Sequence, residues 1–533
     1  MSSFFEMEHK CMTPGKNHLY CLVLFVAFFL AGPSYAQVSV NVPIAHWSYN
    51  AVEKLTSLGL IQSSMPGTKP FTRLEMARLI REARSALERN ASRSRSGAGG
   101  AEIIQATLGR LEAEFSAELD ELRGTSRVST YIKPIEDMYF RYVGSDNNFS
   151  LENDKGQTYA DGTNLRAGFS SHGVIARHLA WYINPEYRYS KEQFGGDDND
   201  FTILEGYGKL QFFNLELEGG RDSLWWGQGY HGSLILTDNA KPFDLIKLSN
   251  PRPVVLPWVL KYLGLFKFAA FWTRLEQDRY IPDAEFMGLR VDIKPFPFLN
   301  IGASRTIMLG GEGPQAPKGI SELSGRDWIR VLSGRNIAGD LDTNQIAGVD
   351  ARLHFCTLDR WIPVLRTLDM WGELYGEDQA GKFPSRNGYV VGMKLGDILL
   401  TGKTDFVLEY ATNVVAEHPG VWYTHHVYRT GYRYDERVMG HDMGGEAREI
   451  FARLEHYLTP DLILGLNYNA QEKGAQHQFQ EERDRYDVDL TWYRSPQIFF
   501  QGGYRFESIE NKDNVASADQ DNRILSLSMT YSF

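Results

Sequence analysis

From about residue 128 to Phe533 the chain is dominated by segments in which apolar and polar residues alternate. In residues 486–492, four apolar side chains alternate with two aspartates and a threonine. Residues 525–533 repeat the rhythm with serine and threonine at the polar positions. Such alternation predicts strands with one apolar and one polar face. A soluble sandwich also alternates, but these segments run for about ten residues, the length of a strand that crosses a membrane.

The connections between these segments are of two kinds. Turns are short at Phe213-Asn214, 294–297, 459–461 and 495–496, whereas long polar connections occur near 223–258, 306–345, 412–446, 471–485 and 507–522. Over the last six strands the two kinds alternate, which is typical of an outer-membrane barrel with short periplasmic turns and long external loops. The aromatic C-terminal Phe533 resembles the terminal signal of such barrels. We therefore predict an all-β fold, a transmembrane antiparallel β-barrel at 128–533, and about 16–18 strands at roughly 20 to 25 residues each.

Different patterns precede the barrel. Residues 1–36 have a basic start, a short apolar run and small residues up to Ala36, which predicts a secretory signal peptide. Residues 37–90 predict a small α-helical periplasmic module, whose second helix opens on a capping box of Thr72 and Glu75. Residues 91–127 predict a linker and an amphipathic helix, either a short coiled coil or a helix docked on a neighbour.

The helical module resembles one S-layer homology repeat, from Val42 through Met76-Ala77. The resemblance implies binding to a cell-wall polymer such as peptidoglycan. Such repeats usually occur in threes, and Asn41 stands where the family usually has an acidic residue. A packing module without wall binding is therefore an equal alternative.

Composition narrows the function classes. The 533 residues carry a net charge of -11 with a pI near 5.7, which argues against nucleic acid as a partner. No segment after the signal peptide is apolar for the roughly 20 residues that a spanning helix needs. Of three cysteines only Cys356 lies outside the signal peptide, so neither an intramolecular disulfide nor a cysteine zinc site is expected.

The residues do not indicate catalysis, a cofactor or a metal. The nucleophile elbow, the zinc-protease helix motif and the phosphate loop are all missing from the sequence, so no catalytic residue is predicted. His425-His426 and His441-Asp442 match no metal site with its remaining ligands. The predicted inward positions give a wet lumen of mixed charge: Arg290, Asp292, Glu409, Arg453, Glu455, Asp487, Asp489 and Arg505.

Two loop segments are predicted to contact sugar. Residues 418–434 gather aromatic rings that can stack on sugar faces, with cations that can donate to hydroxyls and carboxylates. An interfacial aromatic girdle is the alternative. Residues 221–258 combine tryptophans, lysines and four prolines, and we expect this segment to fold into or over the lumen. The candidate polysaccharide-binding residues are Arg221, Trp225, Trp226, Asp238, Asn239, Lys241, Trp422, Tyr423, His425, Arg429, Tyr432 and Arg433.

Motifs in these segments resemble the capsule assembly Wzi family. They are Gly220 to Gly229 (GRDSLWWGQG), Ser233 to Phe243 (SLILTDNAKPF), Gly440 to Gly445 (GHDMGG) and the strand-turn-strand from Leu454 to Asn469. The resemblance covers roughly residues 128–533. It implies an 18-stranded outer-membrane barrel, plugged rather than open, that acts as a lectin for capsular or related exopolysaccharide. The S-layer-like repeat and helix replace that family's usual periplasmic helical portion.

The sequence therefore predicts a non-enzymatic outer-membrane protein that anchors capsular or exopolysaccharide at the cell surface. Its expected partners are that polysaccharide, outer-membrane lipid and, through the S-layer-like module, peptidoglycan. A carbohydrate-type porin is the alternative, because some porins also pair an S-layer-like repeat and helix with a barrel. A lipid or glycan hydrolase would need a nucleophile and a base brought together by the fold.

Overall fold

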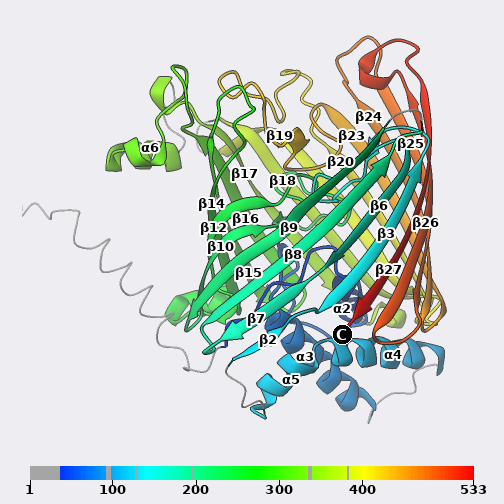
Figure 1. Cartoon of the computed structure of the whole chain (residues 1–533). Coiled ribbons are helices and arrows are strands. Elements are labelled where there is room, and N and C mark those ends of the chain that lie inside the picture. The colour runs from blue at the N-terminus through cyan, green and yellow to red at the C-terminus, as the bar shows by residue number, and fades with distance from the viewer. Residues whose placement is uncertain (1–36, 92–97, 126–129, 194–195, 334–338, 381–382) are drawn as a thin grey trace, which may run out of the picture.

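A closed antiparallel barrel makes up most of the computed structural model, which describes residues 37–91, 98–125, 130–193, 196–333, 339–380 and 383–533 (Figure 1). Within these ranges 18 long strands form the wall, each paired with its neighbours along the chain, and β27 pairs with β3 to close it. The predicted signal peptide and residues 92–97 of the predicted linker lie outside the described residues. The strands are β3 (Asp137–Ser145), β6 (Gly162–Phe169), β8 (Leu179–Lys191), β9 (Asp197–Phe212), β10 (Leu215–Asp222), β12 (Phe243–Ser249), β14 (Leu265–Arg274), β15 (Glu285–Phe296), β16 (Leu299–Leu309), β17 (Asn344–Phe355), β18 (Leu365–Ala380), β19 (Phe383–Ile398), β20 (Thr404–Thr412), β23 (Ala447–Thr459), β24 (Leu462–Lys473), β25 (Glu481–Tyr493), β26 (Ile498–Glu510) and β27 (Gln520–Ser532).

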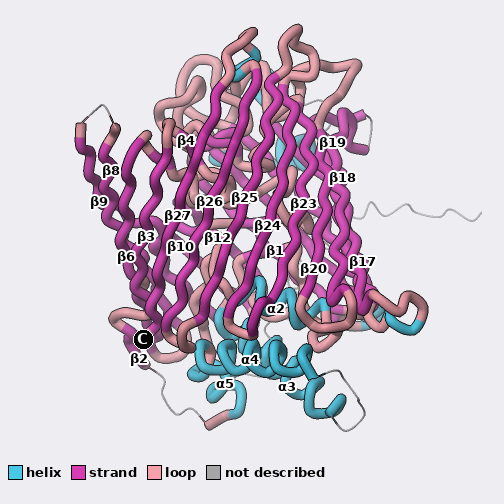
Figure 2. Tube along the Cα trace, turned by 90° about the vertical axis from the view of Figure 1, so that its right-hand side faces the viewer, coloured by secondary structure: helices cyan, strands magenta, loops and turns pink. Residues whose placement is uncertain are grey.

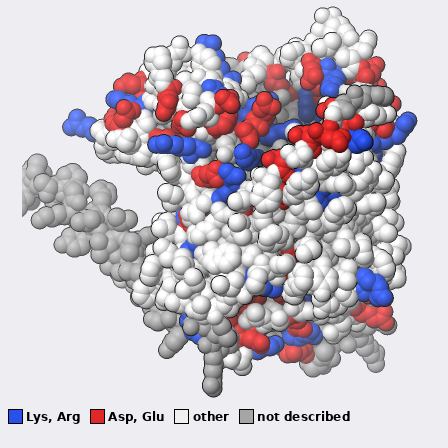
Figure 3. Space-filling view, viewed as in Figure 1, with Lys and Arg blue, Asp and Glu red and all other residues white. Residues whose placement is uncertain are grey.

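The two faces of each strand have opposite character. On β12, Leu245 and Lys247 point into the barrel and are 3% and 5% exposed, whereas Ile246 and Leu248 point outward and are 52% and 42% exposed. An outer surface of aliphatic side chains over a polar interior is the reverse of a soluble barrel and is typical of a membrane barrel. Figure 3 shows charged side chains gathered towards the two ends of the molecule, with few in the band between them.

The two ends of the barrel differ. The chain turns quickly at the end that carries the C-terminus, for example between β9 and β10 and between β23 and β24. At the opposite end long connections follow β3, β10, β16 and β20. The predicted loop 223–258 is shorter than expected, because β12 returns to the wall at Phe243.

Four helices cover the C-terminal end of the barrel: α2 (Ser48–Ser57), α3 (Arg73–Ala91), α4 (Ala98–Glu114) and α5 (Ser116–Arg123) (Figures 1 and 2). The apolar stripe of α4 and α5 packs against α2 and α3 through Leu108, Leu111 and Phe115. The apolar stripe therefore belongs to helices docked on their neighbours and not to a coiled coil. Among the described residues, none of the helices combines the length and apolar character that a membrane crossing requires.

The start of α3 follows the predicted capping box in part. Thr72 Oγ1 accepts a hydrogen bond from Glu75 N at 3.1 Å. The Glu75 carboxylate pairs with Arg78 Nη2 at 2.9 Å. Arg73, which follows the cap, is buried and pairs with Glu114, Glu118 and Glu136, so that one guanidinium joins the helices to the start of the barrel.

Candidate functional site

The loop between β10 and β12 folds into the barrel and crosses its interior. Its strand β11 (Trp225–Trp226) pairs with β1 (Thr68–Lys69), which reaches in from the helical module. An added Cβ at Gly227, whose φ is +132°, would collide with Ser233 and Glu373. Glycine is thus required at this position, where the loop turns against the wall. The loop enters the lumen from one end and β1 of the helical module enters it from the other.

Two carboxylates on the wall hold this loop. Glu373 of β18 accepts hydrogen bonds from Gly229 N at 2.9 Å and Leu234 N at 3.1 Å. Glu409 of β20 accepts from Tyr230 N at 2.6 Å and from the next two backbone amides. The inward carboxylates therefore act as anchors for the plug.

The loop between β20 and β23 covers the first loop from outside. Tyr423 Oη donates to Leu234 O at 2.7 Å, and Tyr432 Oη donates to Ile235 O at 2.9 Å. The two loops form one buried apolar cluster, to which the first contributes Trp226 and the second Trp422. Together, residues 223–242 and 413–446 form what we call the plug.

The twelve candidate sugar-binding residues fall into groups by their exposure. Five aromatic residues and one carboxylate are buried in the plug, with no more than 4% of each exposed: Trp225, Trp226, Asp238, Trp422, Tyr423 and Tyr432. Arg429 and Arg433 are exposed, while Asn239, His425, Arg221 and Lys241 are half-buried or at the rim. The structure thus brings the aromatic residues together as a core, with the cations around it. Contact of these residues with sugar stays a prediction.

The cations at the rim are not all equally available. Arg221 forms a bidentate pair with Asp244, and Lys241 Nζ lies 3.1 Å from Asp435. Arg429 lies over the ring of Tyr280 at 4.7 Å, and Tyr280 is 42% exposed. A guanidinium stacked on an exposed tyrosine offers both a flat face and hydrogen-bond donors to a ligand from outside.

An external groove of about 580 Å³ was missed by the sequence analysis. It lies between the β3–β6 loop, the ends of β8 and β9, and Arg437 of the plug. Phe149 and Tyr159 stack within it, with ring centroids 5.2 Å apart. Its polar lining consists of Asn148, Ser150, Thr158, Arg166, Arg188, Ser190, Glu192, Asp198, Asn199, Asp200 and Arg437. These residues come from distant segments, so no local motif marks the groove.

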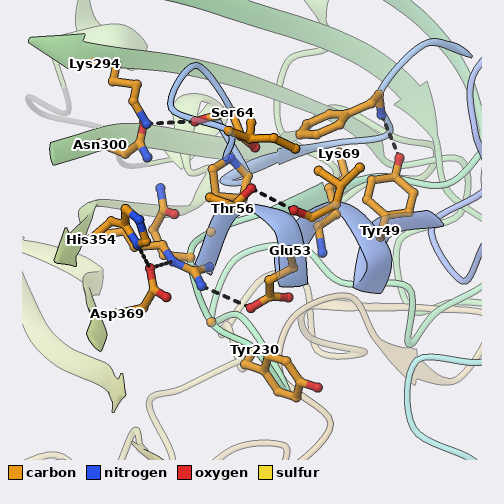
Figure 4. A pocket seen from close by; sticks show the side chains of 18 of the residues that line it. Tyr49, Glu53, Thr56, Ser64, Lys69, Tyr230, Lys294, Asn300, His354 and Asp369 are labelled. Atoms are coloured by element: carbon orange, nitrogen blue, oxygen red, sulfur yellow. Dashed lines mark hydrogen bonds and ion pairs between the residues drawn. The ribbon is translucent and has the colours of Figure 1, made fainter. Parts of the chain in front are cut away.

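A second cavity, of about 270 Å³, lies where α2 meets the barrel (Figure 4). Arg352 donates to Glu53 at 3.1 Å, and His354 Nδ1 lies 2.9 Å from Asp369 on its wall. Glu53 belongs to α2, whereas the other three belong to strands. The helical module therefore encloses the lumen at the end opposite the groove.

Ion pairs line the interior, as predicted for a lumen of mixed charge. Arg290 is fully buried and pairs with Asp292 at 2.6 Å and Asp350 at 2.7 Å. Its Nε donates to Thr68 Oγ1 of the helical module at 2.7 Å. In the plug, burial raises the pKa of Asp238 to about 8, partly offset by Lys155 nearby.

Comparisons with known proteins agree with this architecture. A family model described as capsule assembly protein Wzi matches residues 138–524. A solved Escherichia coli structure, described as Wzi, an outer membrane protein involved in group 1 capsule assembly and a carbohydrate binding β-barrel, superposes with a TM-score of 0.69 at 20% identity, covering 92% of this chain and 99% of that one. A Klebsiella pneumoniae protein, described as an uncharacterized 55.8 kDa protein in the cps region, is 26% identical over 349 residues, which are 65% of this chain and 60% of the relative's length.

Proposed function

Because the chain belongs to the capsule assembly Wzi family, we propose that it binds capsular or related exopolysaccharide at the outer membrane and holds it at the cell surface. The single observation that carries the proposal is that the barrel interior is closed while a groove beside it is open to the outside. A plug anchored by the wall crosses the interior, and the groove faces outward.

The groove has the chemistry of a sugar site. Its volume of about 580 Å³ falls within the range of small-ligand pockets. Hydroxyl, amide and guanidinium groups supply both donors and acceptors, which sugar hydroxyls need. Arg437 Nη1 already donates to Ser150 Oγ at 2.6 Å and so sits where a ligand hydroxyl or carboxylate would be met. Many weak contacts of this kind along a polymer add up to firm retention.

The alternative of a carbohydrate-type porin requires an open path through the barrel. Instead, Glu373 and Glu409 hold residues 229–234 across the interior. The retention role needs no catalytic step, and we propose that the protein is not an enzyme. Contact of the helical module with peptidoglycan remains a proposal, supported only by the S-layer-like pattern of residues 42–77.

Binding of the detergent-purified protein to the host's own surface polysaccharide tests the proposal. We expect saturable binding that Arg437→Ala weakens about fivefold to tenfold, because a charged donor is lost. Arg123→Ala, an exposed arginine on α5 at the opposite end, is the control and should leave binding unchanged. Absence of binding together with ion conductance in a planar bilayer would establish the porin instead.

A further inference from the structure

Two imidazoles and two carboxylates meet where the plug contacts the barrel wall. His231 comes from the first plug loop, His441 and Asp442 from the second, and Glu449 from strand β23. One ligand atom each of His231, Asp442 and Glu449 lies within 4.8 Å of the other two. His441 Nε2 lies 3.8 Å from Glu449 Oε1. The cluster therefore joins both plug loops to the wall.

Two distances within the cluster are longer than hydrogen bonds, although His231 Nε2 also lies 3.3 Å from Asn469 Nδ2. His231 Nε2 lies 3.5 Å from Glu449 Oε1, and His441 Nε2 lies 3.8 Å from the same oxygen. Hydrogen bonds between such atoms span about 2.7 to 3.2 Å. The ligand atoms of a tetrahedral Zn²⁺ site, with bonds of about 2.0 to 2.1 Å, lie roughly 3.4 Å apart. Small side-chain movements would bring these atoms around one ion.

One nitrogen of the cluster, His441 Nε2, is buried without a hydrogen-bond partner, on a side chain that is 0% exposed. The other ring nitrogen, Nδ1, lies 3.2 Å from Asp442 Oδ1. A buried polar atom left without a partner costs about 1 to 3 kcal/mol. The His441 ring is also confined, because an added Cβ at Gly232 would lie 2.5 Å from it. A cation at this position would satisfy His441 Nε2.

The surrounding residues hold the carboxylates in place. Gln471 Nε2 donates to Asp442 Oδ2 at 3.0 Å and also to Glu449 Oε2. Glu449 Oε1 then faces the two histidines, while Asp442 Oδ1 lies 3.2 Å from His441 Nδ1. The ring of Phe451 stacks on His231 with centroids 4.1 Å apart. Supporting contacts of this kind orient the ligands in known metal sites.

One cation, Arg485, lies close to the cluster. Its Nη1 is 3.6 Å from Asp442 Oδ2. Arg485 is also paired with Glu152 at 2.5 Å and with Glu507 at 2.8 Å. Three carboxylates thus share this guanidinium, and it does not neutralise Glu449.

We propose that His231, His441, Asp442 and Glu449 bind one divalent transition-metal ion of the Zn²⁺ type, which fastens the two plug loops to β23. Two imidazoles with two carboxylates favour such an ion over Ca²⁺ or Mg²⁺, which prefer oxygen ligands. Four protein ligands without an open position are typical of a structural site. The inference concerns the plug and does not depend on the polysaccharide.

A second histidine cluster provides the matched control. His426 Nε2 lies 2.9 Å from Asp342 Oδ2, an ordinary hydrogen-bond distance. The His426 side chain is 74% exposed, so this second cluster is open to water, unlike the buried His441 and Glu449. These contacts account for the second cluster without a metal ion.

The test measures the zinc content of the full-length protein in detergent, after EDTA treatment and dialysis against Zn²⁺. We expect about one Zn²⁺ per chain, lost in Glu449→Gln and in His231→Gln, and retained in the double variant His425→Ala/His426→Ala. Zinc should also slow proteolysis of residues 223–242 in the wild type but not in Glu449→Gln. The heat-dependent gel mobility of a folded barrel confirms that each variant has folded.

Three outcomes would overturn the proposal. They are absence of stoichiometric zinc in the wild type, zinc that persists in both folded plug variants, and zinc lost only when His425 and His426 are replaced. X-ray absorption of the loaded wild type should show nitrogen and oxygen ligands at about 2.0 to 2.2 Å. Polysaccharide binding, measured separately on the zinc-free protein, keeps this result distinct from the proposed function.

Discussion

Lys54 of α2 and Asp405 of β20 form a buried ion pair, with Nζ 2.7 Å from Oδ1 and both side chains no more than 3% exposed. The pair connects the helical module to the barrel wall across 351 positions of sequence. Asp405 Oδ1 also accepts a hydrogen bond from Asp397 N at 2.9 Å, so the carboxylate is held from two sides. The module is thus docked on the barrel by specific charge as well as by apolar packing.

Replacing Lys54 should loosen the module. Lys54→Met leaves a buried carboxylate without its close partner, which costs about 3 to 5 kcal/mol. We expect faster proteolysis between the module and the barrel. Lys318→Met is the control, because its pair with Asp340 is exposed and worth less than about 1 kcal/mol. Equal proteolysis rates in the two variants would contradict the role of the pair.

Variants of Trp422 and Arg429 should distinguish residues that pack the plug from residues that contact sugar. Trp422 is fully buried, so Trp422→Ala removes plug core at a cost of about 3 to 5 kcal/mol and should raise the protease sensitivity of residues 413–446. Arg429→Ala, at an exposed position, should leave that sensitivity unchanged and lower polysaccharide affinity a fewfold. If Arg429→Ala binds as tightly as the wild type, the exposed cation is not part of the site.

The plug should become less stable as pH rises towards about 8. Burial raises the pKa of Asp238 from 3.8 to about 8, so the folded plug holds a proton that the unfolded loop releases. Stability is therefore full below about pH 4 and is lost as pH rises through the folded value. Hydrogen exchange of residues 223–242, corrected for intrinsic rates, should quicken as pH rises from about 4 to about 8. Asp238→Asn should remove this dependence, whereas the exposed Asp244→Asn should keep it.

Removing a wall anchor should open the barrel. Glu409 accepts hydrogen bonds from three plug amides and from Trp371 Nε1 at 2.6 Å. We expect Glu409→Ala to raise single-channel conductance above that of a nearly silent wild type, because residues 230–232 lose their acceptor. Glu472→Ala, which removes an exposed carboxylate at the loop end of β24, serves as the control. Silent channels in Glu409→Ala would show that the other contacts suffice to close the lumen.

The sequence by itself determined the barrel, its alternating faces and the side of its long loops. These features are local, because every second side chain of a strand faces the same way and a turn is read from adjacent residues. The predicted range of 16–18 strands includes the 18 of the structure. Polar inward positions such as Arg290 and Glu409 also followed from the alternation.

Only the tertiary structure decided what the loop residues do. Trp226 and Trp422 have the composition of a sugar-binding surface, yet they meet across nearly 200 residues to form the plug core. Phe149 and Arg437 line one groove, and His231 and Glu449 approach within 3.5 Å, although the loops that bring them together are long and irregular. Burial and proximity between distant segments depend on the summed packing of the whole chain, and no local pattern encodes them.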